Sequence, residues 1–149
     1  MSARLLIVED EPIVRLHLQK LLAELGHEVV GSASTAEDAV ARAEAEDPDL
    51  VLMDISLKGE GDGVDAARRL RDRCNSSVVF LTAFADENTV RRTEEVGALG
   101  YIVKPFSANE LRAVLSTSLA LHRRLGPRVT RRPSETSVVP IGGMIGESE

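Results

Sequence analysis

A chain of 149 residues, of which 43% are hydrophobic, is long enough for one domain with a substantial core, which excludes wholesale disorder. Its net charge of -6 argues against a general nucleic-acid-binding protein, and no apolar run approaches the roughly 18 residues that a membrane span requires. The single cysteine excludes an internal disulfide and the N-terminus lacks a signal-peptide pattern, so we expect a cytoplasmic protein that is not attached to a membrane.

Five short apolar runs, each bounded by turn-forming or polar residues, predict five β-strands. The runs are apolar almost throughout rather than alternating with polar residues, which is typical of strands that are buried on both faces of a parallel sheet. The predicted strands span residues 4–8, 28–32, 50–53, 77–81 and 99–103.

A helix is predicted after each strand, because apolar residues recur there at helical spacing behind a residue that suits a helix start. Pro12 suits the first turn of the first helix, and Ser107 with Glu110 forms a capping box in front of the last. The predicted helices begin near Pro12, Ser34 or Thr35, Asp62, Asp86 and Ser107, and they end near Gly26, Pro48, Arg73, Gly97 and Arg124.

The repeated strand–helix unit predicts an α/β fold with a parallel sheet and helices on both faces. We expect the flavodoxin-like, doubly wound (βα)5 arrangement with strand order 2-1-3-4-5, in which the ligand crevice lies between the first and third strands. Residues 1–125 form this predicted domain. Residues 126–149 are rich in proline and glycine, so they are predicted to be a C-terminal tail or linker.

Polar residues follow four of the five predicted strands, at the point where each strand ends. Because the carboxyl ends of parallel strands meet at one edge of a sheet, we expect these residues to gather in a single crevice. Acids, a hydroxyl and a lysine together suit a divalent cation and a phosphoryl group. The residues are Glu9 and Asp10, Asp54, Thr82 and Ala83, and Lys104 and Pro105.

The three acids of this set predict a magnesium site. Carboxylates in one crevice repel one another unless a cation lies among them, and Mg²⁺ binds one or two carboxylates together with waters and a phosphate. An alternative is that Glu9, Asp10 and Glu11 only stabilise the start of the following helix as acids of its first turn. Asp54 favours the metal site, because an unpaired charge at the end of a buried strand is costly.

The other members of the set suit a phosphate ligand. Lys104 could pair with Asp54 and contact a phosphate as a point charge. The hydroxyl of Thr82 and the amide of Ala83 could each donate a hydrogen bond to a phosphate oxygen, although a hydroxyl at a strand end also bonds locally. Pro105 restricts Lys104 to an extended conformation and makes the bond between them a candidate cis peptide.

Taken together, these spaced motifs resemble the receiver domain of response regulators in two-component signalling, the family of the bacterial chemotaxis response regulator, over about residues 3–124. The resemblance implies that Asp54 is the phosphoacceptor. It also implies that Glu9, Asp10 and Asp54 hold Mg²⁺, with the backbone carbonyl of Ser56 as a further ligand. Such a domain is a phosphoacceptor rather than an enzyme, apart from self-catalysed phosphotransfer and dephosphorylation.

The same resemblance implies a donor and a switch. A sensor histidine kinase or a phosphotransfer protein would donate the phosphoryl group from a phosphohistidine. Lys104 would then contact the phosphate, Thr82 would move inward as the switch hydroxyl, and Tyr101 would rotate from an exposed to a buried position. Without the family context, Tyr101 could instead be a fixed core residue.

Three features depart from the common pattern of the family. The loop from Leu57 to Gly63 is one residue longer and has no proline, and in this it is similar to stand-alone receivers that work with HWE-type or related kinases. Leu99 and Gly100 replace two acids of a DNA-binding subfamily, which weakens the case for a salt-bridged homodimer. Ser56 and Phe84 occupy the positions that tend to set phosphate lifetime; the apolar Phe84 predicts slow hydrolysis, because it would hinder an attacking water.

Several functions remain open. The chain could be a free-standing receiver that acts as a shuttle, a phosphate sink or a regulator of a partner. It could also be part of a longer response regulator with an output domain beyond Glu149. A phosphatase-like hydrolase is disfavoured, because Ser56 stands where such enzymes need a second acid. No helix-turn-helix pattern follows residue 125, so nucleic-acid binding is not predicted within this chain.

Overall fold

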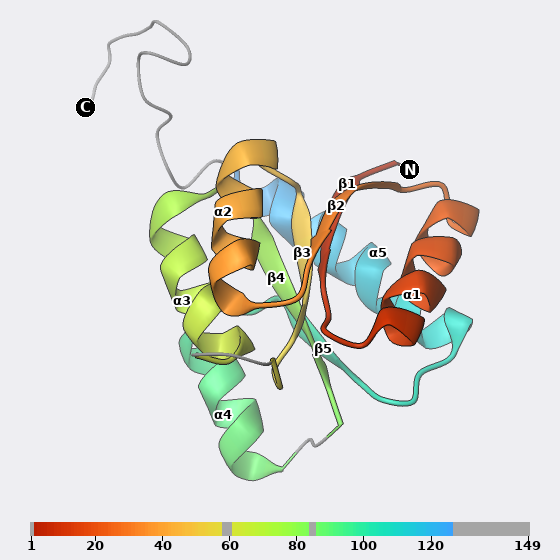
Figure 1. The fold of residues 1–149 in the computed structure, drawn as a ribbon. Helices are drawn as coiled ribbons and strands as arrows, with labels where there is room; N and C mark the ends of the chain where they lie inside the picture. Colours follow the sequence, from red (N-terminus) through yellow and green to blue (C-terminus); the bar gives the residue numbers. More distant parts are fainter. Residues whose placement is uncertain (1, 58–60, 84–85, 127–149) are drawn as a thin grey trace, which may run out of the picture.

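A computed structural model describes residues 2–57, 61–83 and 86–126 of the chain. Five parallel strands form one sheet in the order β2-β1-β3-β4-β5 (Figure 1), so the predicted α/β class and strand order are confirmed. The strands are β1 (Arg4–Val8), β2 (Glu28–Ala33), β3 (Leu50–Asp54), β4 (Ser77–Thr82) and β5 (Gly100–Val103). The helices are α1 (Pro12–Glu24), α2 (Ala36–Glu46), α3 (Gly63–Arg73), α4 (Glu87–Glu95) and α5 (Ala108–Leu125).

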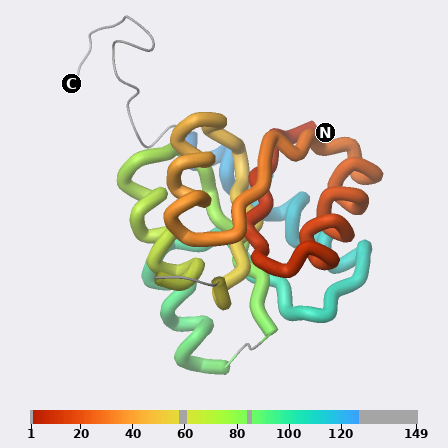
Figure 2. The backbone as a smooth tube through the Cα atoms, viewed as in Figure 1, coloured from red at the N-terminus to blue at the C-terminus, as the bar shows by residue number. Residues whose placement is uncertain are grey.

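Helices cover both faces of the sheet, with α2, α3 and α4 on one side and α1 and α5 on the other (Figures 1 and 2). Alternate residues of β1 point to opposite sides, as the two-residue period of a strand requires. Leu6 and Val8 join the core beneath α2 and α3, whereas Leu5 and Ile7 join the core beneath α1 and α5. The central strands are therefore buried on both faces, which agrees with their nearly continuous apolar sequence.

Side-chain caps start most of the helices where the sequence predicts them. Thr35 rather than Ser34 caps α2, because its hydroxyl accepts from the Asp38 amide at 3.1 Å. Capping boxes begin α3 at Asp62 and α5 at Ser107. These caps fix where each helix starts relative to the strand before it, and so they position the loops at the carboxyl edge of the sheet.

The last helix that the structure describes, α5, ends at Leu125. Apart from Gly126, the tail predicted for residues 126–149 lies outside the described residues. Within the part of the chain that the structure describes, no helix combines the length and apolar character that crossing a membrane would need.

Candidate functional site

Glu9 occupies the innermost position at the carboxyl edge of the sheet. It follows β1 directly, and its backbone amide donates to the carbonyl of Ala33 at 2.9 Å, which continues the sheet by one residue. Its carboxylate has no exposed surface, and Oε2 accepts from the Glu11 amide at 3.2 Å. The Arg15 guanidinium holds the Glu9 carbonyl at 2.7 Å. The side chain is therefore directed into the crevice rather than toward solvent.

The alternative that these acids merely stabilise the start of α1 is wrong. Glu11 is the N-cap residue, but its side chain makes no capping hydrogen bond. No acidic residue lies in the first turn of α1.

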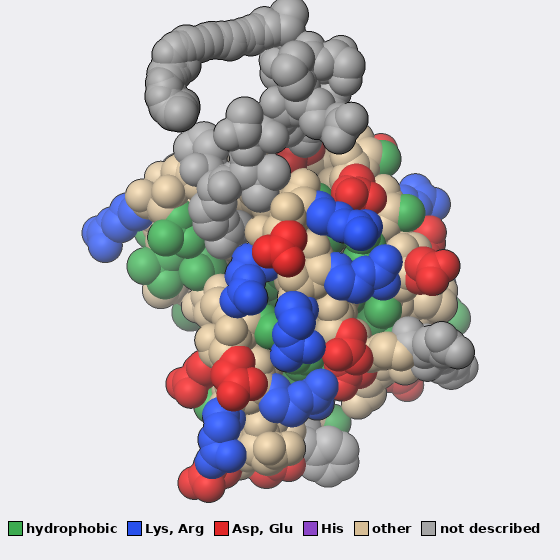
Figure 3. All heavy atoms as spheres, turned by 90° about the vertical axis from the view of Figure 1, so that its left-hand side faces the viewer, with side chains coloured by type: hydrophobic (Ala, Val, Ile, Leu, Met, Phe, Trp, Pro, Cys, Tyr) green, Lys and Arg blue, Asp and Glu red, His purple; other side chains and the backbone are tan. Residues whose placement is uncertain are grey.

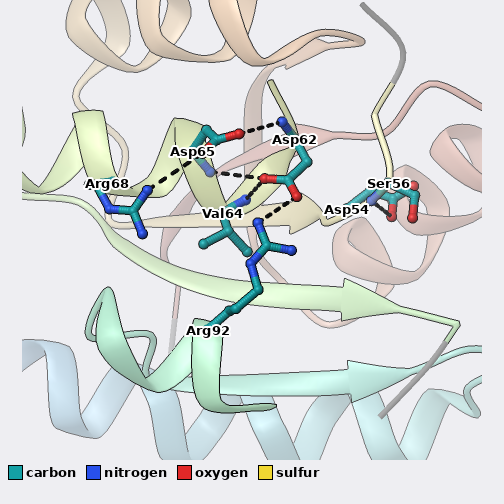
Figure 4. A network of polar contacts seen from close by, with 7 residues as sticks. All are labelled: Asp54, Ser56, Asp62, Val64, Asp65, Arg68 and Arg92. Atoms are coloured by element: carbon teal, nitrogen blue, oxygen red, sulfur yellow. Dashed lines mark hydrogen bonds and ion pairs between the residues drawn. The ribbon is translucent and has the colours of Figure 1, made fainter. Parts of the chain in front are cut away.

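Asp54 ends β3 beside Glu9 and is only 4% exposed. Its Oδ1 accepts from the Ser56 amide at 3.1 Å (Figure 4), and the amide of Ile55, between these two residues, donates to the carbonyl of Leu81 at 3.0 Å. These bonds fix the carboxylate at the junction of β3 and the following turn. One carboxylate oxygen from each of Glu9, Asp10 and Asp54 lies within 4.8 Å of the others, so the sequence-predicted acids do come together.

Lys104 closes the acidic cluster from the side of β5. Its Nζ lies 2.8 Å from Oε1 of Glu9, 3.2 Å from Oδ2 of Asp54 and 4.0 Å from Oε1 of Glu11. The Lys104 amide donates to the carbonyl of Thr82 at 2.7 Å, and the peptide bond between Lys104 and Pro105 is cis. The sequence pairs this lysine with Asp54, and the structure adds a shorter contact to Glu9.

Burial and charge act against each other in this cluster. Burial raises the pKa of Glu9 above its usual range. The Lys104 ammonium lowers this pKa, whereas the Asp54 carboxylate raises it further. Burial alone would lower the pKa of Lys104, but the carboxylates of Glu9 and Asp54 outweigh it and raise that pKa. The ammonium is thus firmly charged, and one cation faces three carboxylates.

This excess of negative charge fits a divalent cation. Glu9, Asp10 and Asp54 supply oxygen atoms at mutual distances that one small cation can span, and carboxylate oxygens are the ligands that Mg²⁺ prefers. The donor set contains only oxygen, which does not suit the softer metals that select sulfur or imidazole.

The structure also describes four other predicted site residues, namely Ser56, Thr82, Ala83 and Tyr101. Thr82 ends β4 and is buried at 5% exposure, whereas Ala83 just beyond it is exposed. Tyr101 on β5 is 41% exposed, so the alternative of a fixed core residue is wrong. Ser56 has an exposed side chain next to Asp54, and Phe84 lies outside the described residues.

Gly63 is a site residue that sequence reasoning missed. A Cβ atom at this position would collide with the carbonyl oxygen of Asp54 and would lie 2.9 Å from Cγ of Met53. The Gly63 amide donates to the carbonyl of Ile55 at 2.9 Å. The first residue of α3 therefore packs on the backbone of the phosphoacceptor candidate, and only glycine fits there. A glycine directly behind a helix-capping aspartate was the only available signal.

Comparison with known proteins identifies the family of this chain. A family model described as response regulator receiver domain matches residues 5–116. The transcriptional regulatory protein PdtaR of Mycobacterium tuberculosis is 38% identical over 122 residues, which cover 82% of this chain and 59% of that protein. The phyllosphere-induced regulator PhyR of Methylorubrum extorquens is 37% identical over 120 residues, which cover 80% of this chain and 44% of that protein.

A solved structure extends the likeness to three dimensions. The signal receiver domain of a modulated diguanylate cyclase from Desulfovibrio desulfuricans G20 has a TM-score of 0.77 and 34% identity, over 84% of this chain and 99% of that one. The family model covers most of the described sheet and helices, including all four strand ends of the acidic crevice. The chain therefore belongs to the response regulator receiver domain family of two-component systems.

Proposed function

We propose that this receiver accepts a phosphoryl group on Asp54 from the phosphohistidine of a sensor histidine kinase or a phosphotransfer protein, in the cytoplasm and with Mg²⁺. One observation carries the proposal. The Asp54 carboxylate stands between the Lys104 ammonium at 3.2 Å and the Ser56 amide at 3.1 Å, inside a cluster of three acids. Groups that can neutralise an incoming phosphoryl group thus already surround the candidate nucleophile.

The chemistry requires positioning more than covalent assistance. An oxygen of Asp54 would attack phosphorus, the bond between phosphorus and the donor imidazole nitrogen would break, and the electron pair would return to the imidazole. Lys104 would screen the negative charge of the phosphoryl oxygens. When bound by Glu9, Asp10, Asp54 and the Ser56 carbonyl, Mg²⁺ would supply further charge neutralisation at these oxygens.

The same residues would report the modification. Thr82 lies at the end of β4, the strand next to β3, and it could move toward the phosphate to donate a hydrogen bond. Tyr101 lies on the neighbouring β5, opposite Phe80 in the ladder, and is exposed in this structure. Inward rotation of Tyr101 after movement of Thr82 would alter the surface of α4, β5 and α5, through which the domain would signal to a partner.

The surface next to the crevice suits a donor protein. Ile13 and Leu16 at the start of α1 are 82% and 64% exposed, and they follow Glu11, which contacts Lys104. Nearby, the ring of His17 stacks on that of Phe106, with centroids 6.0 Å apart, so α1 and the loop after β5 present one continuous surface. Exposed apolar side chains beside a reactive group mark a site of protein contact, which here would be the phosphohistidine-bearing helices of the donor.

A second candidate is a receiver that controls an attached output domain. The chain spans 59% and 44% of the lengths of PdtaR and PhyR, so those proteins contain further sequence. A regulator acting only through other proteins, as a shuttle, a sink or a homodimer, uses the same phosphorylation chemistry. Phe84 supports a long-lived phosphoryl state in either case, because an apolar residue would hinder an attacking water.

A phosphotransfer profile against the organism's histidine kinases tests the proposal. Each kinase is phosphorylated with labelled ATP and mixed with the chain, with Mg²⁺ or with EDTA. We expect rapid label transfer from a cognate kinase that EDTA prevents and Asp54→Asn abolishes, whereas Asp38→Asn at an exposed position of α2 transfers normally. Label on the Asp54→Asn variant would refute the assignment of the phosphoacceptor.

A further inference from the structure

An ion pair joins α4 to the N-cap residue of α3. Nη2 of Arg92, in the last turn of α4, donates to Oδ2 of Asp62 at 2.7 Å (Figure 4). Asp62 is the residue that caps α3, and it is thirty positions away from Arg92 in the sequence. Both side chains are partly buried, so the pair is better shielded than the other arginine–acid pairs of α3 and α4.

Asp62 is held on all its polar atoms. Its Oδ1 accepts from the amides of Val64 and Asp65 at 3.0 and 3.1 Å, and its own amide donates to Oδ2 of Asp65 at 3.0 Å. Oδ2 is thus the oxygen left for α4. Partial burial would raise the pKa of Asp62, but Arg92 and the Asp65 amide hold it below its usual range. The Asp62 side chain is a charged, fixed link between two helices.

The residue after Asp62 reaches the phosphorylation site. Gly63 packs against the Asp54 carbonyl, and its amide donates to the carbonyl of Ile55 at 2.9 Å. The Ser56 amide in the same turn holds the Asp54 carboxylate. A displacement of Asp62 would therefore move the backbone that carries the Ser56 amide and the Asp54 carboxylate.

Arg92 differs from its neighbours in where its partner lies. Figure 3 shows basic and acidic side chains gathered over the face that contains α3 and α4. Arg91 pairs with Glu87 in its own helix, and Arg68 pairs with Asp65 in its own helix. Among the ion pairs that the structure describes on these two helices, only that of Arg92 reaches the N-cap residue of α3.

We propose that Arg92 is a positioning residue for the phosphorylation site, which acts through Asp62 to fix the start of α3 against the Asp54 backbone and thereby couples the position of α4 to the state of Asp54. The inference rests on the proposed function, because it names a residue that supports the same site. The coupling is reciprocal. A partner that shifts α4 alters ion affinity at the acidic cluster, and occupation of the cluster alters the surface of α4.

The test compares Arg92→Gln with the matched control Arg91→Gln by calorimetric titration with Mg²⁺ alone. We expect Arg92→Gln to weaken Mg²⁺ binding by about threefold to fivefold, the upper range for a partly exposed ion pair. Arg91→Gln stays within about twofold of the wild type, because a helix-internal surface pair contributes little. Arg92→Lys, which keeps the charge, recovers part of the lost affinity.

A double-mutant cycle with Asp62→Asn separates this role from general destabilisation. Asparagine caps a helix about as well as aspartate, so the substitution mainly removes the charge that faces Arg92. If Arg92 acts through Asp62, the double variant loses no more Mg²⁺ affinity than either single variant. If the losses of Mg²⁺ affinity in the two single variants multiply in the double variant, the two residues have independent roles, which would overturn the proposal.

Amide hydrogen exchange without metal keeps the inference separate from the proposed function. We expect the amides of Ser56 and Gly63 to exchange faster in Arg92→Gln but not in Arg91→Gln. If this occurs while the wild type binds no Mg²⁺, the positioning role stands and the proposed metal site is wrong. Equal exchange and equal Mg²⁺ affinity in the two variants would overturn the role of Arg92.

Discussion

The ammonium of Lys104 lies closer to Glu9 than to the phosphoacceptor candidate, with Nζ 2.8 Å from Oε1 of Glu9 and 3.2 Å from Oδ2 of Asp54. Glu9 has no exposed surface, so this lysine is the cation nearest to the most deeply buried charge of the site. A bound phosphoryl group would therefore compete with Glu9 for Lys104. In the absence of metal, Lys104 therefore has a structural role, which is to neutralise buried Glu9, in addition to its proposed contact with the phosphoryl group.

Replacement of Lys104 by methionine should destabilise the domain and make it dependent on Mg²⁺. Loss of one partner of a buried ion pair leaves the other uncompensated, which costs about 3 kcal/mol. We expect calorimetry in EDTA to show a lowered Tm, and added Mg²⁺ to raise that Tm more than it raises the wild-type value. Lys20→Met on the exposed side of α1 is the control. A Lys104→Met variant as stable as the wild type in EDTA would contradict the prediction.

Glu9→Gln should separate metal affinity from folding. The neutral amide removes a buried charge that repels Asp54, so the free energy of unfolding without metal should not decrease. Loss of a carboxylate ligand should raise the Kd for Mg²⁺ by about tenfold or more. Titration calorimetry measures the affinity and urea unfolding measures the stability. Glu11→Gln, two residues further on and exposed, should leave both values nearly unchanged.

Gly63→Ala should damage the site through the backbone. The added methyl group has no room against the Asp54 carbonyl and Met53, so the turn must shift. We expect a loss of about 1–3 kcal/mol in the free energy of unfolding and a lower rate of phosphorylation. Gly31→Ala in β2 is the matched control, because its Cβ would come no closer than 3.5 Å to Cδ1 of Leu6. Equal stability of the two variants would show that the turn adapts.

Asp62 should contribute stability that depends on pH. Its pKa is lower in the folded chain than in the unfolded one, so the contribution is present above the unfolded value of about 4 and disappears as the pH falls through the folded value. We expect Asp62→Asn to be less stable than the wild type by about 0.5–1 kcal/mol at pH 7, and the difference to vanish toward pH 3. Urea unfolding of both proteins across this pH range provides the measurement.

Ile13→Ser should slow transfer from the cognate kinase without impairing the phosphoacceptor. Loss of an exposed apolar contact at the donor surface should reduce the transfer rate by about fivefold to tenfold. Phosphorylation by a small phosphodonor such as acetyl phosphate needs no protein contact and should be unchanged. Leu121→Ser on α5 serves as a control, because it removes another exposed apolar side chain. Equal loss with both donors would place the effect of Ile13 inside the site.

Much of the fold could be predicted because it depends on local patterns. Apolar runs, helical spacing and caps such as Asp62 and Ser107 identified every strand and helix to within a few residues. The acidic cluster could be predicted for the same reason, since parallel topology alone brings Glu9 and Asp54 to one edge of the sheet.

Contacts across long sequence distances could not be predicted. The pair of Arg92 with Asp62 depends on the packing of α4 against the start of α3, and the sequence offers several equivalent arginines. The preference of Lys104 for Glu9 depends on side-chain geometry that no motif encodes. The burial of Cys74, the C-cap residue of α3, likewise depends on how the end of that helix packs onto the sheet.

The alternation of β1 has a consequence for how this chain tolerates change. Leu5 and Ile7 face one core and Leu6 and Val8 face the other, so removal of one residue from β1 would reverse these assignments on one side of the deletion. Glu9 follows β1 in the same alternation, so a reversal on its side of the deletion would also turn its carboxylate away from Asp54. An odd-numbered insertion or deletion in this strand would thus exchange residues between the two cores, and where the reversal includes Glu9 it would break the charge cluster as well.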